Sequence, residues 1–193
     1  KQKIINQLTV LKTADAGEQQ HAPIKRLERL AEKVRSGDPT NNEAQAAKLY
    51  WQAIMGQGFR RLTAGEDFIN GALNYGYTVI RAACARATCA AGLQPALGLH
   101  HHNQNNPFCL VDDLMEPFRP LVDLVVVQWL KDENMLSERL ESEHKVALAK
   151  VLTRDLNVDE TSTPVSSAME MLAFSLVKSL EENSVQLKLP AIP

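Results

Sequence analysis

The longest uninterrupted helical pattern of the chain runs from Phe68 to Ala91 and reads FINGALNYGYTVIRAACARATCAA. Its many Gly and Ala residues allow neighbouring elements to approach closely, so we expect a central and nearly buried helix here. Four polar side chains interrupt this apolar surface, and each needs a partner where it is buried. They are Asn70, Asn74, Arg81 and Arg86.

Helical periodicity covers most of the remaining chain, and no alternating strand pattern precedes residue 43. The ranges expected to be helical are 1–13, 23–35, 40–55, 110–132, 142–155 and 164–183, with a turn or linker at 157–163. We therefore predict an all-α fold. One multi-helix domain would span residues 1–186, and a tail of residues 187–193 would be extended or disordered.

The composition is that of a protein with a sizeable core, because 45% of the 193 residues are hydrophobic. A net charge of −2 excludes a global basic field for nucleic acid, so any such surface must be local. Three cysteines fit neither a disulfide framework nor a zinc knuckle, which indicates a reducing compartment. No apolar run reaches the roughly 18 to 20 residues that span a bilayer, and no signal peptide opens the chain. We expect a cytoplasmic protein without a membrane segment, and the initial Lys indicates a piece of a longer protein.

The segment after this helix concentrates groups that could carry chemistry: residues 92–120 read GLQPALGLHHHNQNNPFCLVDDLMEPFRP. Asp113 and Glu116 are three positions apart and project from one side of a helical turn. Hard divalent cations prefer oxygen ligands, while Mn²⁺ tolerates a His nitrogen. One of the three histidines, this carboxylate pair and a further acid would make a metal site that polarises a phosphodiester. Histidines in a loop are also often simply solvated, so spacing alone leaves both interpretations open.

Two other features have ordinary structural interpretations beside functional ones. Thr40 and Glu43 have the Thr-x-x-Glu spacing of a capping box, in which the Glu carboxylate folds back onto the start of the helix. Arg60 and Arg61 lie in a predicted loop after Met55, where they could neutralise phosphates or simply be solvated.

Several of these motifs resemble one known family. Residues 92–101 (GLQPALGLHH) and 112–123 (DDLMEPFRPLVD) resemble the signature of the CRISPR-associated endonuclease that acts as the spacer integrase of the adaptation module. Upstream, residues 41–51 (NNEAQAAKLYW) resemble the segment that carries this family's first metal-binding glutamate, and residues 69–77 (INGALNYGY) resemble its N-x-L-N-Y-G-Y helix. The motifs follow the family order and look closest to those of type II systems.

The resemblance implies a site for Mg²⁺ or Mn²⁺ whose catalytic ligands are Glu43, His101 and Glu116. The family's Gly-x-x-His spacing, counted from Gly98, selects His101 among the three histidines. Asp113 would be an auxiliary group. Because this assignment gives Glu43 a second role, the capping box and the metal ligand need not exclude each other.

The resemblance also implies a reaction and partners. Metal-assisted transesterification would join the 3′-hydroxyl of a DNA fragment (the prespacer) to a phosphodiester at a CRISPR repeat. Arg119 matches a basic position near the DNA backbone, whereas Arg60 and Arg61 are added from their charge alone. Family members form homodimers bridged by a small ferredoxin-like partner protein. They begin with a β-rich domain, which is missing before Glu43, so the chain would be the helical catalytic part alone.

Two hypotheses from other functional classes compete with that of a spacer integrase. The chain could be a catalytically inert helical domain that only binds DNA or partners. It could also be a carboxylate-bridged metal oxidoreductase in a helix bundle, but that class carries Glu-x-x-His motifs on paired helices, and we expect no such pair here.

Overall fold

The computed structural model describes residues 1–14, 21–35, 38, 40–65 and 67–193. Its elements in chain order are α1 (Gln2–Ala14), α2 (His21–Lys33), α3 (Asn42–Met55), α4 (Phe68–Ala90), α5 (Cys109–Met115), η2 (Glu116–Phe118), α6 (Arg119–Trp129), η3 (Glu133–Met135), α7 (Ser142–Ala149), η4 (Lys150–Thr153), β1 (Asp155–Val158), β2 (Thr161–Pro164) and α8 (Val165–Glu181). The prediction of an all-α fold is confirmed, since the sheet in these residues is a single two-stranded hairpin.

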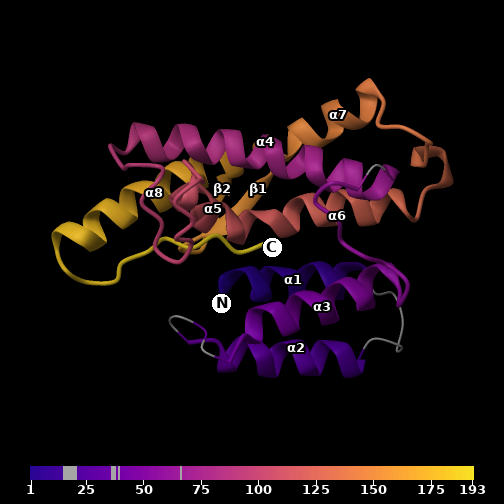
Figure 1. Cartoon of the computed structure of the whole chain (residues 1–193), viewed down its shortest axis with the longest axis horizontal. Coiled ribbons are helices and arrows are strands. Elements are labelled where there is room, and N and C mark those ends of the chain that lie inside the picture. Colours follow the sequence, from indigo (N-terminus) through magenta and orange to yellow (C-terminus); the bar gives the residue numbers. More distant parts are fainter. Residues whose placement is uncertain (15–20, 36–37, 39, 66) are drawn as a thin grey trace.

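Helix α4 runs along the larger layer of the molecule (Figure 1), but the prediction that it is nearly buried is wrong, because Thr78, Ala82 and Arg86 on one side of it are exposed. It contacts α5, α6, α7 and α8. Gly76 shows why small residues are needed, because a Cβ there would lie 2.4 Å from Val122 Cγ1 and 3.2 Å from Leu148 Cδ2. Real Cβ atoms do not approach carbon so closely, so a larger residue would push α6 and α7 away from α4.

Helices α1, α2 and α3 form a second layer beside the first (Figure 1). Helix α1 joins the two, because it contacts α2 and α3 on one side and α6 and η2 on the other. Its residues Ile4, Val10 and Leu11 are fully buried in the same hydrophobic cluster as Phe118 and Val122. The two layers therefore share one core.

The polar side chains of α4 have partners where they are buried. Asn70 accepts hydrogen bonds from Arg61 Nη1 (3.0 Å), and Asn74 accepts one from Arg61 Nη2 (2.6 Å). Arg81 makes a two-pronged ion pair with Asp112 at 2.6 and 3.0 Å. Arg86 is exposed, so it does not interrupt a buried surface as expected.

Two predicted helices are shorter than expected. The range 110–132 is divided into α5, η2 and α6, because Pro117 and Pro120 lack the N–H that a continuous helix needs. The range 142–155 ends its α-helix at Ala149 and continues as η4 and then β1. The break at the two prolines agrees with the expected kink. The helix predicted over 142–155 is wrong in its second half, because the α-helix ends at Ala149.

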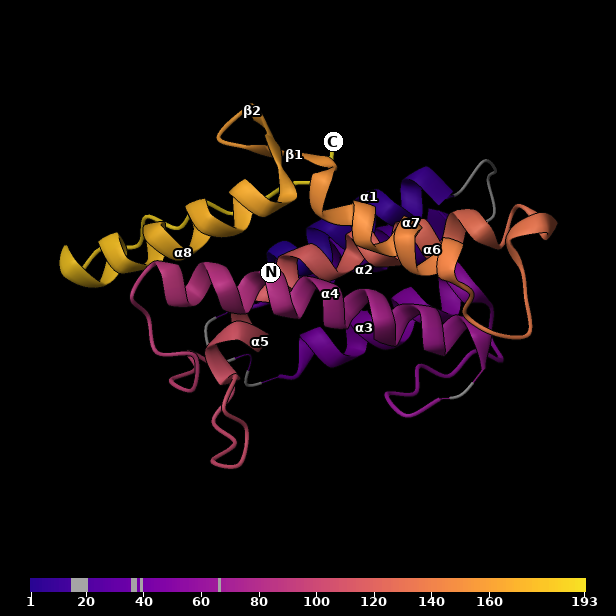
Figure 2. The same ribbon diagram turned by 90° about the horizontal axis from the view of Figure 1, so that it is seen from above.

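The expected turn or linker at 157–163 is mostly strand. Strands β1 and β2 pair antiparallel with Leu156 opposite Thr163, and Leu156 and Val158 alternate inward. Asp159 and Glu160 make the turn at φ values of 49° and 64°, the left-handed conformation of a tight hairpin. Figure 2 shows this hairpin at one edge of the molecule.

The tail after residue 186 is extended and attached to the domain. Ala191 exchanges two backbone hydrogen bonds of 2.8 Å with Asn157. The buried amide of Asn6 donates to the carbonyl oxygens of Pro190 (3.1 Å) and Pro117 (2.7 Å). The side chain of Asn6 therefore connects α1, η2 and the C-terminal tail.

No helix in the described ranges is long and apolar enough to cross a lipid bilayer.

Candidate functional site

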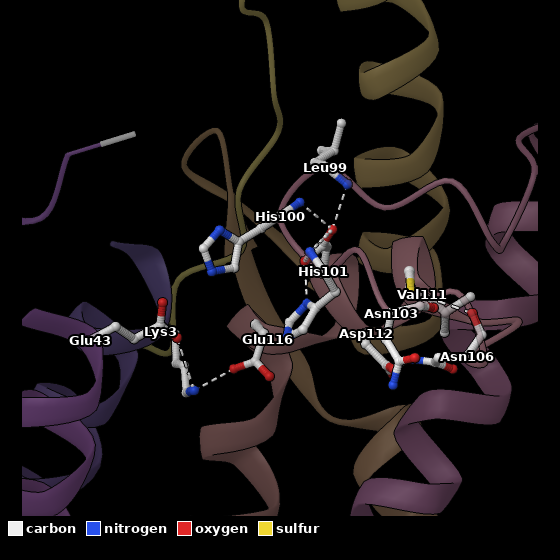
Figure 3. Close-up of polar contacts among 12 residues, drawn as sticks. Lys3, Glu43, Leu99, His100, His101, Asn103, Asn106, Val111, Asp112 and Glu116 are labelled. Atoms are coloured by element: carbon white, nitrogen blue, oxygen red, sulfur yellow. Dashed lines mark hydrogen bonds and ion pairs between the residues drawn. The ribbon is translucent and has the colours of Figure 1, made fainter. Parts of the chain in front are cut away.

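A cavity of about 670 Å³ lies where α1, α3, η2 and the loop before α5 meet. Its polar lining includes Lys3 on α1, Glu43 in the first turn of α3, His101 in the loop and Glu116 in η2. The three metal ligands that the resemblance implies thus line one cavity, although they come from three separate segments (Figure 3).

The ammonium of Lys3 lies between two carboxylates of this cavity. Its Nζ is 3.1 Å from Glu43 Oε1 and also forms a close ion pair with Glu116 Oε2 (Figure 3). Arg119 Nε pairs with the other oxygen of Glu116 at 2.9 Å. Burial alone would lower the pKa of Lys3, but Glu116 and Glu43 outweigh it and raise the pKa above its usual value. The site therefore holds a charged ammonium between Glu43 and Glu116.

Asp113 lines the same cavity and organises the histidine loop. Its carboxylate accepts the backbone N–H groups of Leu99 (2.6 Å), His100 (2.8 Å) and His101 (3.3 Å). It also binds Nδ1 of His101 at 2.5 Å. With Nδ1 held in this way, Nε2 is the ring nitrogen that can bind an ion. This geometry suits the auxiliary role expected of Asp113.

Gly98 makes that arrangement sterically possible. A Cβ at this position would lie 2.2 Å from the carbonyl oxygen of His101 and 3.1 Å from Asp113 Oδ2. The Gly-x-x-His spacing thus has a physical reason, because the loop folds back over Gly98 before it reaches His101. His100 also lines the cavity, and its ring lies edge-on against that of His101 at 5.5 Å between centroids.

The expected capping box at Thr40 to Glu43 is wrong. The N-cap of α3 is Asn41, at φ 53°, and it makes no side-chain capping bond. The backbone N–H of Glu43 instead donates to Asp38 Oδ2 at 2.7 Å. This bond is the main reason why the pKa of Asp38 is lowered. Because Asp38 caps the helix, the side chain of Glu43 is available to the cavity.

The donor set fits a divalent ion, but it is not yet arranged around one point. The described residues hold no group of three or more His, Cys, Asp or Glu side chains already converged as ligands. Two carboxylates and one imidazole are nevertheless a suitable set for Mn²⁺ or Mg²⁺. The ammonium of Lys3 is itself a cation shared by Glu43 and Glu116. Glu43, His101 and Glu116 are thus the residues that could hold a metal.

The three arginines expected to contact DNA lie in different settings. Arg61 and Arg119 place their guanidinium carbons 5.1 and 4.9 Å from the ring centre of Tyr77, beside the cavity. Both line a smaller neighbouring cavity of about 100 Å³. Arg60 is exposed and lines neither cavity; its backbone carbonyl accepts a hydrogen bond from Asn70.

Sequence reasoning missed two parts of this site. The sequence motifs assign no function to Lys3, although this charged residue stands beside Ile4 and Ile5 on a predicted amphipathic helix. Asp123 is 1% exposed and accepts hydrogen bonds from Tyr50 (3.1 Å) and Tyr77 (2.5 Å). Burial raises the pKa of Asp123 to about 6. An acid inside the apolar run LVDLVVV was a signal that could have identified it.

Contrary to expectation, the Glu-x-x-His spacing of a bundle oxidoreductase occurs at Glu141 and His144, where it has a structural role. Nδ1 of His144 accepts the backbone N–H of Glu141 at 3.0 Å, and its ring packs between Phe68 and Trp129. A second such pair, Glu18 and His21, includes a residue outside the described ranges.

Comparison with known sequences shows the family. The sequence model of the CRISPR associated protein Cas1 matches residues 1–157. A CRISPR-associated endonuclease Cas1 of Neisseria meningitidis is 42% identical over 193 residues, which is 100% of this chain and 61% of that protein. Another from Pyrobaculum aerophilum is 31% identical over 163 residues, covering 81% of this chain and 53% of that protein. The chain belongs to the Cas1 family, and it spans less than two thirds of the length of these relatives.

Solved structures show the same fold. A casposase bound to an integration product superposes with a TM-score of 0.74 at 22% identity, over 97% of this chain and 63% of that chain. A CAS1 protein from Thermotoga maritima gives a TM-score of 0.73 at 17% identity, over 93% of this chain and 62% of that one. The helical domain described above is therefore the Cas1 C-terminal domain.

Proposed function

We propose that this chain is the catalytic part of a metal-dependent DNA endonuclease and integrase that inserts new spacers into a CRISPR array. One observation carries the proposal. Glu43 on α3 and Glu116 in η2 already share a cation, the ammonium of Lys3, in a cavity that His101 also lines. Family membership adds support, because the relatives are named as endonucleases.

The reaction is a transesterification. The 3′-oxygen of a prespacer forms a new bond to a phosphorus atom at the CRISPR repeat and loses its proton to solvent. The bond from that phosphorus to the 3′-oxygen of the repeat strand breaks, and this oxygen takes up a proton. A bound Mg²⁺ or Mn²⁺ would stabilise the attacking or leaving oxygen.

The residues of the chain would each contribute a defined part. Glu43, Glu116 and Nε2 of His101 hold the ion, and Asp113 fixes the orientation of the His101 ring through Nδ1. Arg119 and Arg61, next to the cavity, neutralise phosphate oxygens of the DNA. Arg60, which is exposed outside the cavity, would contact a more distant phosphate.

The partners we propose are a prespacer DNA, the CRISPR repeat, a second copy of the protein and a small ferredoxin-like adaptation protein. All would meet in the cytoplasm. Because the chain spans only part of the length of its relatives, the whole activity belongs to the full protein that contains it.

The test is Mn²⁺-dependent cleavage and strand transfer on branched DNA by that full protein. Glu43→Gln and His101→Ala should each reduce the rate by at least about 100-fold, as expected when a metal ligand is lost. His102→Ala is the matched control, because it changes an exposed histidine of the same loop and should leave the rate unchanged. Full activity in Glu43→Gln or His101→Ala would overturn the assignment. DNA binding without any cleavage in the unmodified protein would favour a domain that only binds DNA or partners.

A further inference from the structure

Lys3 stands at the boundary of two cavities. It lines the large cavity with Glu43 and Glu116, and it also lines the small cavity with Gln7, Arg61, Arg119 and Asp123. Its side chain is 19% exposed and belongs to α1, the helix that joins the two layers. Lys3 is therefore placed to contact either cavity.

A divalent ion and the ammonium cannot share the carboxylates. Glu43 and Glu116 carry two negative charges, and Lys3 and Arg119 already balance them. An ion bound to the same oxygens would lie within a few ångströms of the ammonium. Like charges at that distance in a partly buried site repel strongly, so the ammonium must move when the ion arrives.

The small cavity offers that ammonium a new partner. Gln7 lies four residues after Lys3 on α1, so both side chains project from one face of the helix. Gln7 is 3% exposed, and its Oε1 has no hydrogen-bond partner among the described residues. A buried acceptor in this condition gains from any donor that reaches it, and an ammonium brings three donors on a flexible stem.

The charges around the small cavity partly attract and partly repel the ammonium of Lys3, so the ammonium can return to Glu43 and Glu116 when the ion leaves. The carboxylate of Asp123 attracts the ammonium, while the guanidinium groups of Arg61 and Arg119 oppose it. Without an ion between Glu43 and Glu116, the ammonium is more stable at the carboxylates, as the structure shows.

We propose that the ammonium of Lys3 competes with the divalent ion for the metal site: it occupies Glu43 and Glu116 when no ion is bound, gives way to the ion, and then bonds Gln7 Oε1. This inference rests on the proposed function. It means that two residues of α1, Lys3 and Gln7, set the affinity of the site for its metal.

The test is a calorimetric titration of the full protein with Mn²⁺ in the absence of DNA. Lys3→Met removes the competing charge but keeps an unbranched side chain, so Mn²⁺ should bind about tenfold more tightly or better. Gln7→Leu removes the acceptor that receives the ammonium and should weaken Mn²⁺ binding several-fold. In the Lys3→Met background, Gln7→Leu should have no further effect, because Gln7 acts only through Lys3. Lys12→Met, on the same helix but pairing with Glu28, is the matched control and should not change the affinity.

The outcomes separate the two proposals. Mn²⁺ affinity that is unchanged or lower in Lys3→Met overturns the role of Lys3. An equal loss from Gln7→Leu in both backgrounds overturns the role of Gln7. If Glu43→Gln leaves Mn²⁺ binding intact in the otherwise unmodified protein, the metal site itself is wrong and both proposals fail. Circular dichroism checks the fold of each variant, and Lys3→Gln repeats the charge removal with a polar side chain if Lys3→Met does not fold.

Discussion

The two halves of the candidate site are built in different ways. His101 is fixed by contacts that are near in sequence, because Asp113 on the adjoining helix accepts hydrogen bonds from three backbone N–H groups of the loop and binds the imidazole of His101. Glu43 and Glu116 lie on opposite sides of the joint between the layers and are connected by Lys3 from a third helix. The first half depends on local geometry, and the second depends on how the layers pack. A short sequence motif can specify the local contacts of His101, whereas the contact of Glu43 with Glu116 through Lys3 forms only when the layers pack.

Loss of packing should disrupt the second half most strongly. Phe118 is fully buried at the end of η2, two residues after Glu116. Phe118→Ala leaves a cavity and should lower the free energy of unfolding by about 3–5 kcal/mol. Chemical denaturation measures this loss. The exposed Phe174→Ala is the control and should cost far less. A loss at Phe118 no larger than that at Phe174 would show that η2 is not fixed by its packing.

The contacts of Asp123 should make stability depend on pH. Tyr50 of α3 and Tyr77 of α4 both bind this acid of α6. Its pKa is about 6 in the fold, against 3.8 for an unperturbed Asp. The folded protein therefore keeps the proton longer, and this group's contribution to stability falls as pH rises from about 4 to 6. Two pKa units correspond to about 3 kcal/mol.

A comparison with Asp123→Asn measures that contribution. The variant cannot titrate at this position, so its stability relative to the unmodified protein should improve as pH rises from 4 to 7. Urea denaturation at several pH values gives the difference. A difference that does not change with pH, or that changes in the opposite direction, would show that Asp123 stays ionised in the folded protein.

Gly98→Ala should disturb the first half while leaving the layers intact. The new Cβ would meet the carbonyl oxygen of His101 and the carboxylate of Asp113, so the loop must shift. Such overpacking costs about 1–3 kcal/mol. Gly58→Ala, in another loop with open space around it, is the control and should be nearly neutral. Equal melting temperatures for the two variants would contradict the close packing of the histidine loop.

Asp113→Asn should leave the packing of the two layers intact and act mainly on the metal. One amide oxygen can still accept backbone N–H groups, but the NH₂ that replaces the other oxygen cannot accept, so the variant loses bonds to the loop and no longer balances the charge or fixes the tautomer of His101. Loss of such an outer partner typically lowers metal affinity by about 10–100-fold. Mn²⁺ titration measures this, with Asp132→Asn, an exposed acid elsewhere, as the control. Unchanged affinity would mean that Asp113 shapes the loop without tuning the ligand.

The sequence predicted what periodicity and local spacing encode. It indicated the helix 68–91 and the breaks at Pro117 and Pro120. A family resemblance named Glu43, His101 and Glu116 as metal ligands, and the structure places all three around one cavity. The sequence did not reveal the β1–β2 hairpin, because only Leu156 and Val158 alternate inward on β1. It also assigned the cap of α3 to Thr40, since the competing Asp38 acts from five residues before Glu43. Lys3 remained hidden because its partners are distant in the chain.

The amide of Asn6 has a practical consequence for anyone who shortens or tags this chain. It bonds Pro190 in the tail and Pro117, the residue that follows Glu116. Removing residues 187–193 would take away two hydrogen bonds of that amide, one to the carbonyl oxygen of Pro190 and one from the N–H of Ile192, together with the strand pairing of Ala191 with Asn157. The last residues thus support the peptide next to a candidate metal ligand, and a C-terminal deletion also perturbs the candidate metal site.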